Sequence, residues 1–197
     1  MSKDKKIKRV KGVPSDTLDV YALIGRYYQP ESKGYTILIE HSECVAAKAL
    51  EIANRHKNWK LDLRFLYEGA MLHDIGIYLC DAPEIGCYGE EPYIRHGVLG
   101  ADLLRAEGLP EHALVCERHT GTGITLEMIE TGQLPLPHRE MVPITLEEQI
   151  ICFADCFYSK SGDPKEEKSV ERLTKSMAKH GQEQVQRFEA WCRLFLS

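Results

Sequence analysis

The residues Leu72-His73-Asp74-Ile75-Gly76 place an imidazole directly beside a carboxylate at the end of an apolar segment. Imidazole and carboxylate groups together bind iron, manganese, zinc or magnesium in mixed nitrogen and oxygen coordination. The apolar residues Ala70 and Met71 before the pair indicate that the site excludes water. A single His-Asp pair is weak evidence, so the interpretation depends on partners elsewhere in the chain.

Asp155 is a second candidate ligand, because it lies inside the strongly apolar run from Ile150 to Phe157. A buried carboxylate without a partner is unfavourable, so it must be paired, protonated or bound to metal. Of these alternatives we favour the metal ligand.

Three histidines complete the candidate set. His41 shares a helical stripe with Val45 and is therefore expected to point inward, where a histidine is more often a core residue than a ligand. Six ligands are too many for one tetrahedral zinc, so they suit two metals that share a carboxylate, or one metal with additional substrate-positioning histidines. The expected ligands are His41, His73, Asp74, His96, His119 and Asp155.

The elements that must position these side chains are expected to be helices, because apolar residues recur at spacings of three and four nearly throughout. Caps are expected to begin helices at Ser15 or Asp16, at Asp62, at Thr125, at the capping box Thr145-x-x-Glu148 and at Asp163. Nothing indicates a β-hairpin, and residues 77–90 are expected to form an irregular loop. Helices are expected at about residues 15–24, 35–56, 63–74, 92–107, 111–119 and 125–132, from 145, from 163, and at the C-terminus, where Val185, Phe188, Trp191 and Phe195 share one stripe.

The length of the chain and the helical spacing of its apolar residues predict a single all-α domain whose facing helices surround the metal ligands. Residues 1–14 are expected to form a basic tail and residues 15–197 the domain, with a core at about 35–160 and C-terminal helices at 164–197 packing on it. The aromatic stripe of the last helix suits core packing or a homodimer equally well.

The net charge and the cysteine content limit the binding partners and the cellular compartment that we expect for this protein. A net charge of −5 argues against a nucleic-acid polymer held by a broad basic face, while it allows a small phosphorylated substrate. We expect no export signal, because residues 1–11 lack the apolar stretch of a signal peptide, and no apolar run approaches the ~20 residues that span a membrane. Seven cysteines without a Cys-x-x-Cys pair favour a reducing cytoplasm. Cys152 and Cys156 are one turn apart and could hold metal, but we favour two small apolar residues.

The order His41, His73-Asp74, Asp155 resembles the HD superfamily of metal-dependent phosphohydrolases, whose best-known form contains the run LHDIG found here at Leu72 to Gly76. The resemblance extends from about His41 to Lys160. Segments 118–125, 145–148 and 154–155 look like those of small uncharacterised HD proteins from archaea and bacteria. Arg95-His96-Gly97 and His119 are also similar to HD hydrolases that split diadenosine tetraphosphate.

This resemblance implies an HD-type helical bundle and a role for each ligand. His41, His73, Asp74 and Asp155 would hold a first divalent metal ion, chosen from Fe, Mn, Mg, Zn or Ni. His96 and His119 would hold a second ion, with Asp74 bridging the two. Ile77 and Thr120 stand where the cyclic-dinucleotide phosphodiesterases of the superfamily carry a lysine and a second histidine, which argues against that substrate.

The implied reaction is attack by a metal-activated hydroxide on a phosphoester or phosphoanhydride of a nucleotide or another small metabolite. His73, Asp74 and Lys160 would take part in catalysis. Thr120, Thr122, Arg95, Arg118 and Lys160 are candidate substrate-binding residues, although the threonines equally suit a tight turn and the arginines surface ion pairs. Two alternatives stay open: a di-iron oxygenase of the same fold, and a catalytically silent nucleotide sensor.

Overall fold

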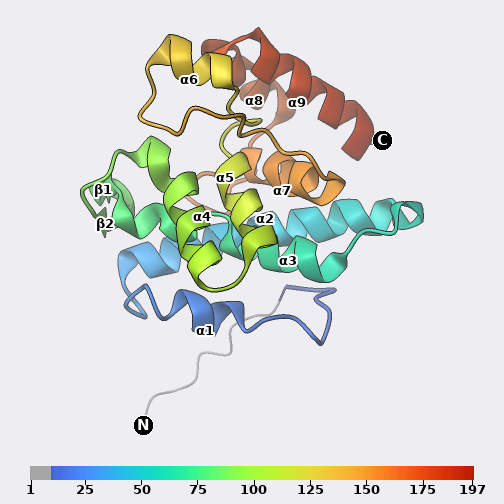
Figure 1. Cartoon of the computed structure of the whole chain (residues 1–197). Coiled ribbons are helices and arrows are strands. Elements are labelled where there is room, and N and C mark those ends of the chain that lie inside the picture. The colour runs from blue at the N-terminus through green and yellow to red at the C-terminus, as the bar shows by residue number, and fades with distance from the viewer. Residues whose placement is uncertain (1–9) are drawn as a thin grey trace.

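A computed structural model describes residues 10–197 and confirms the all-α fold (Figure 1). Its centre is a helical bundle in which α2 packs on α3 and α7, and α4 packs on α5. One shorter helix, α1, contacts α3, and α8 and α9 lie beyond α7 on the opposite side of the bundle. The helices are α1 (Val20–Ile24), α2 (Lys33–Arg55), α3 (Leu63–Leu72), α4 (His96–Ala106), α5 (Pro110–Arg118), α6 (Leu126–Gly132), α7 (Leu146–Cys156), α8 (Val170–Met177) and α9 (Gln182–Phe195).

Side-chain caps begin several of these helices where the sequence predicts them. Asp62 accepts hydrogen bonds from the amides of Arg64 and Phe65 at the start of α3. Thr125 accepts one from Met128 at α6, and Thr145 accepts one from Glu148 at α7. Each bond satisfies an amide that has no partner inside its own helix, which contributes about 1 kcal/mol.

The first helix begins later than predicted. Its cap is Asp19, which accepts from Ala22, and not Ser15 or Asp16. In the segment before it, the Leu18 amide donates to the buried carboxylate of Glu68 on α3 at 2.7 Å. A tertiary contact therefore overrides the local capping preference.

The loop at residues 77–90 also departs from the prediction, because it contains a short antiparallel pair. Strands β1 (Asp81–Ala82) and β2 (Cys87–Tyr88) pair around a turn in which Gly86 has a φ of 78°. A ladder of two residues is too short to show apolar alternation in the sequence. The 3-10 helices η2 (Ile75–Leu79) and η3 (Pro83–Ile85) make up most of the rest.

The prediction that a helix begins at Asp163 is also wrong. Asp163 instead caps a turn by accepting from the Lys165 amide at 2.9 Å, and α8 starts only at Val170 with Ser169 as its cap. Ion pairs with α2 hold the intervening chain: Lys165 with Glu40 at 2.6 Å, and Lys48 with Glu167 at 2.5 Å. These pairs fix an extended path between α7 and α8.

The apolar stripe predicted for the last helix is buried in α9. Phe188 and Phe195 of α9 lie against Phe153 of α7, with ring centroids 5.5 and 5.3 Å apart, and Trp191 is edge-on to the same ring. Burial of each phenyl ring stabilises the fold by roughly 1.5–3 kcal/mol. Core packing thus accounts for this stripe, and the homodimer stays a prediction.

The N-terminal tail is only partly described. Residues 1–9 of the predicted basic tail lie outside the described residues, whereas Val10 and Val13 are half-buried against the core. Within residues 10–197 no helix is both long and apolar enough to cross a membrane.

Candidate metal centre

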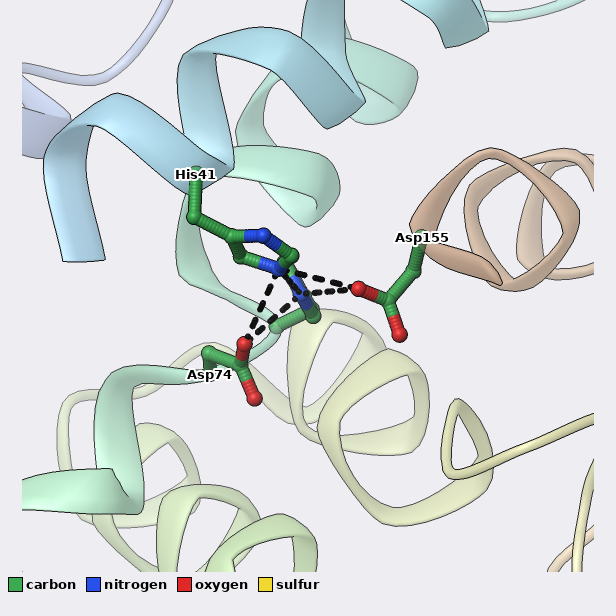
Figure 2. A group of neighbouring side chains, drawn as sticks. His41, Asp74 and Asp155 are labelled. Carbon is green, nitrogen blue, oxygen red and sulfur yellow. Dashed lines mark hydrogen bonds and ion pairs between the residues drawn. The ribbon is translucent and has the colours of Figure 1, made fainter. Parts of the chain in front are cut away.

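Four of the predicted ligands converge where α2, the end of α3 and α7 meet. The Nε2 atom of His41 lies 2.9 Å from Oδ1 of Asp155 and 3.3 Å from Oδ2 of Asp74. Figure 2 shows these three side chains directed toward one another. His73 directs its Nε2 atom to the same two carboxylates, at 3.0 Å from Asp74 and 3.4 Å from Asp155. The four ligand atoms lie within 4.8 Å of one another. We call His41, His73, Asp74 and Asp155 the first ligand group.

The remaining two histidines form a second group around the other oxygen of Asp74. The Nε2 atoms of His96 and His119 lie 3.4 and 3.3 Å from Asp74 Oδ1 and 3.1 Å from each other. We call Asp74, His96 and His119 the second ligand group. Because each carboxylate oxygen of Asp74 faces a different group, this residue is placed to bridge two cations.

Backbone carbonyls decide which nitrogen of three imidazoles faces the centre. The Nδ1 atoms of His73, His96 and His119 each lie 2.7 Å from the carbonyl oxygen three residues earlier, at Ala70, Tyr93 and Cys116. A carbonyl only accepts, so each Nδ1 must carry the proton. In the neutral ring, Nε2 then presents a lone pair to the centre, which is the form that binds metal.

The same arrangement leaves polar atoms that a cation would satisfy. Asp74 Oδ1 is fully buried and has no hydrogen-bond donor among the described residues. Around it, the Nε2 lone pairs of His96 and His119 face one another at a distance where two acceptors repel. This donor set fits a divalent cation with nitrogen and oxygen ligands.

The carboxylates and His73 depend on one another electrostatically. Burial by itself raises the pKa of Asp74, but His73 and Lys160 reverse this and hold that pKa well below its ordinary value. Burial likewise opposes the charging of Asp155, and Lys160 and His41 hold its pKa low. Burial also opposes the charging of His73, yet Asp74 and Asp155 raise the pKa of His73 to about 10.

His96 behaves in the opposite way. Burial lowers the pKa of His96 to about 4, and Asp74 only partly offsets this effect. His96 therefore stays neutral at physiological pH. It is placed as a ligand that needs no deprotonation.

Lys160 is the predicted auxiliary cation, and it reaches the first ligand group. Its ammonium forms an ion pair with Asp74 Oδ2 and lies 3.5 Å from Nε2 of His41. Burial opposes its positive charge, but Asp74 and other nearby groups raise the pKa of Lys160 above its ordinary value. The residue thus stays charged beside the centre.

A close approach of α4 brings His96 into place. A Cβ atom on Gly76 would lie 2.3 Å from the carbonyl oxygen of His96 and 2.4 Å from the amide nitrogen of Gly100. Only glycine fits between η2 and α4 at this point. The glycine of the LHDIG run therefore lets α4 pack closely enough to place His96 beside Asp74.

Comparison with known proteins identifies the family. The profile of the HD domain matches residues 38–160, which include all six candidate ligands. The chain belongs to the HD domain family. The resemblance seen in the sequence is thereby confirmed.

Three archaeal proteins are similar to this chain. An uncharacterised protein of Methanocaldococcus jannaschii is 40% identical over 60% of the chain and 64% of its own length. Two proteins named tRNA (cytidine(56)-2'-O)-methyltransferase are also similar. The one from Thermoplasma volcanium is 33% identical over 77% of the chain and 39% of its own length. The one from Picrophilus torridus is 34% identical over 60% of the chain and 30% of its own length.

The chain therefore spans less than two thirds of the length of each of these relatives. No solved structure matches the chain.

A cavity of about 560 Å³ reaches the first ligand group at Asp155 and the neighbouring Lys160. Thr120 and Tyr93 line it beside the ligands, and Met128 and Leu134 line it near α6. A volume of this size accommodates a small organic molecule. The ligand groups are thus reached from a pocket and not from open surface.

Of the predicted substrate-binding residues, the structure brings only Thr120 and Lys160 to this cavity. Thr122 is fully buried, and its hydroxyl lies 2.9 Å from Oε1 of Gln184 on α9. The glycines that flank it, Gly121 and Gly123, adopt φ values of 64° and 98° and form a tight turn. The turn, and not a phosphate contact, thus accounts for Thr122.

The two arginines are also engaged away from the cavity. Arg118 forms a two-pronged ion pair with Glu148 at 3.0 and 3.1 Å, and Arg95 pairs with Glu91. The sequence allows both alternatives for these residues, and their positions correspond to ion pairs. Cys152 and Cys156 do not belong to either ligand group; their thiols contact the carbonyls of His119 and Gly121.

Tyr93 is a site residue that the sequence did not reveal. Its ring stacks on His96 with centroids 4.8 Å apart, its carbonyl accepts from that imidazole, and it lines the cavity. Its position three residues before a candidate ligand was the available signal, because a helical or 3-10 turn brings that carbonyl to Nδ1.

Proposed function

We propose that this chain is a metal-dependent phosphohydrolase that acts on a phosphoester or phosphoanhydride of a nucleotide or another small phosphorylated metabolite. The observation that carries the proposal is the convergence of Nε2 lone pairs on a shared carboxylate next to a lysine-lined cavity. Membership of the HD domain family supports the same class of reaction.

The first ligand group would hold one divalent cation and the second group another, with Asp74 contributing to both. A cation bound there would make water nucleophilic at neutral pH and neutralise charge on the phosphoryl oxygens. The protein's part is to hold a proton on Nδ1 of His73, His96 and His119 through the carbonyls of Ala70, Tyr93 and Cys116, so that Nε2 of each ring would face a bound cation.

Lys160 and Thr120 would orient the substrate. The Lys160 ammonium is beside the ligand groups and faces the cavity, so it can pair with a phosphoryl oxygen. Burial of His73 and Asp74 excludes water from the far side of the centre. The reacting phosphate is therefore expected at the cavity end where Asp155 and Lys160 meet.

The test combines metal analysis with a substrate screen. The purified full chain is analysed for bound metals and then assayed against phosphorylated metabolites with Mn²⁺, Mg²⁺, Fe²⁺, Zn²⁺ or Ni²⁺. We expect phosphate release with at least one metal, and its loss in Asp74→Ala. Oxygen consumption without phosphate release would contradict the proposal and favour the oxygenase alternative.

A further inference from the structure

Part of the outer wall of the cavity comes from a segment of the chain that the HD domain match does not cover. That match ends at residue 160, whereas Lys168, Leu173 and Met177 line the cavity from the linker before α8 and from α8 itself. The inner end carries the ligand groups, and the outer end includes residues of the segment that follows residue 160. Substrate selectivity is therefore expected to reside in the outer wall.

Lys168 is the notable residue of this wall, because no carboxylate neutralises it. Its ammonium donates to the carbonyl oxygen of Tyr158 at 3.0 Å, and no ion pair to Lys168 occurs within residues 10–197. The lysines around it differ: Lys160 pairs with Asp74, and Lys165 pairs with Glu40. Lys168 thus brings a positive charge to the cavity that no protein group offsets by direct contact.

Its position is held by the backbone. The Lys168 amide donates to the Phe157 carbonyl at 2.9 Å, so the linker turns back on the end of α7. Burial lowers the pKa of Lys168, while Asp155 acts in the opposite direction. A cation that is partly withdrawn from water and fixed in place gains more from an anionic ligand than a freely solvated lysine does.

The rest of the wall divides the cavity into polar and apolar parts. Ser159 and Ser161, whose hydroxyl oxygens lie 3.1 Å apart, flank Lys160 in the sequence and also line the cavity. Met128, Leu134, Leu173 and Met177 line the apolar part, from α6 and α8 and the segment that follows α6. An uncharged organic body fits between these groups.

We propose that Lys168 forms a second anion subsite, so that the cavity selects phosphorylated molecules bearing a second negatively charged group over simple monoesters. The first anionic group would lie at Lys160 and the ligand groups, and the second at Lys168, with the uncharged body against the apolar part. The catalytic consequence rests on the proposed function, whereas anion binding at Lys168 does not.

Calorimetric titration with non-hydrolysable ligands tests this subsite. The full chain, saturated with Mn²⁺, is titrated with alkane bisphosphonates of one, three or five methylene groups and with the matching alkyl monophosphonates. We expect wild-type protein to bind at least one bisphosphonate about tenfold more tightly than its monophosphonate. Lys168→Met should abolish this preference and leave monophosphonate affinity unchanged.

The matched control is Lys175→Met, because Lys175 is an exposed lysine of α8 that does not line the cavity. This variant should keep the preference for the bisphosphonate. Lys168→Gln provides a second neutral variant, and circular dichroism verifies that both fold. The subsite is refuted if wild type shows no preference, or if Lys168→Met weakens both ligand classes equally.

A separate activity measurement distinguishes failure of the proposed function from failure of the anion subsite. Turnover of p-nitrophenyl phosphate is measured in the same preparations, since this monoester needs only the inner end of the cavity. Absence of turnover in wild type together with a Lys168-dependent preference would refute the hydrolase and keep the subsite. Turnover without that preference would refute the subsite and keep the hydrolase.

Discussion

The two ligand groups share Asp74 but differ in charge and in the elements that build them. The first group has two carboxylates, from the end of α3 and from α7, with Lys160 in contact. The second group has two imidazoles and only the shared oxygen of Asp74. Two carboxylates balance the charge of a divalent cation, whereas one shared carboxylate does not.

This difference predicts a tight first site and a weaker second site. The electrostatic attraction for a cation falls when a carboxylate is removed, and Asp74 is already engaged with the first group. The pKa values show the same asymmetry, since the carboxylates raise that of His73 to about 10 while burial lowers that of His96 to about 4. Loss of individual ligands should therefore have graded effects.

Asp74→Ala should have the largest effect, because the residue serves both groups. We expect the loss of all bound metal and a fall in phosphate release of at least about a hundredfold, more than loss of a residue that only supports a ligand. Removal of the buried carboxylate also leaves Lys160 and His73 without their partner, which costs about 3–5 kcal/mol. Elemental analysis and steady-state kinetics measure the outcome.

Because Asp74→Ala is destabilising, Asp74→Asn is prepared in parallel and its fold is verified by circular dichroism. A folded Asp74 variant with full metal content and full activity would overturn the assignment of both groups.

Asp155→Ala should rank second. The first group loses a carboxylate and retains His41, His73 and Asp74, so we expect the metal content to fall by about one equivalent while activity falls about a hundredfold. Metal titration followed by calorimetry should show that the tighter of two binding events has disappeared. If the weaker event disappeared instead, the order of the two sites would be reversed.

His119→Ala should have a smaller effect, confined to the second group. The first group keeps all of its ligands, so the tight binding event should persist while the weak event is lost. We expect activity to fall about tenfold to a hundredfold if the second cation assists the reaction. Unchanged binding stoichiometry would show that His119 supports substrate and does not hold metal.

Removal of metal from the wild-type chain should have a milder effect on stability than Asp74→Ala, because the helices retain their packing. A cation at one hundred times its dissociation constant stabilises the folded state by about 2.7 kcal/mol, which raises the melting temperature by roughly 5–10 °C. A chelator should reverse this shift in wild type and in His119→Ala. In Asp74→Asn the chelator should leave the melting temperature unchanged, and a shift there would locate the stabilising cation elsewhere.

Local sequence accounts for much of this fold. The spacing of apolar residues predicts the helices of the bundle, and Asp62, Thr125 and Thr145 begin three of them by bonds within four residues. Local preference fails at Ser15 and Asp163, where the chain follows contacts with Glu68, Glu40 and Lys48 that lie far away in sequence. Such contacts leave no periodic pattern near the residues they affect.

The chemical types of the ligands could also be predicted, because a carboxylate within an apolar run must be paired, protonated or bound to metal. The sequence did not predict which of the neighbouring polar residues line the cavity beside these ligands. Thr120 and Thr122 are two residues apart, yet one lines the cavity and the other bonds to Gln184 of α9. The turn at Gly121 separates them, and its direction depends on the packing of α9.

The sequence by itself predicted the helical bundle from the spacing of apolar residues, and the six candidate ligands from their residue types and expected inward positions. The family followed from the resemblance of the LHDIG run and of the order of the ligands. Only the tertiary structure decided that Asp74 divides its oxygens between two groups and that carbonyls orient three imidazoles. It alone brought Lys168 to the same cavity as Lys160. Distances between side chains on different helices depend on how the helices pack, and packing is a property of the whole chain.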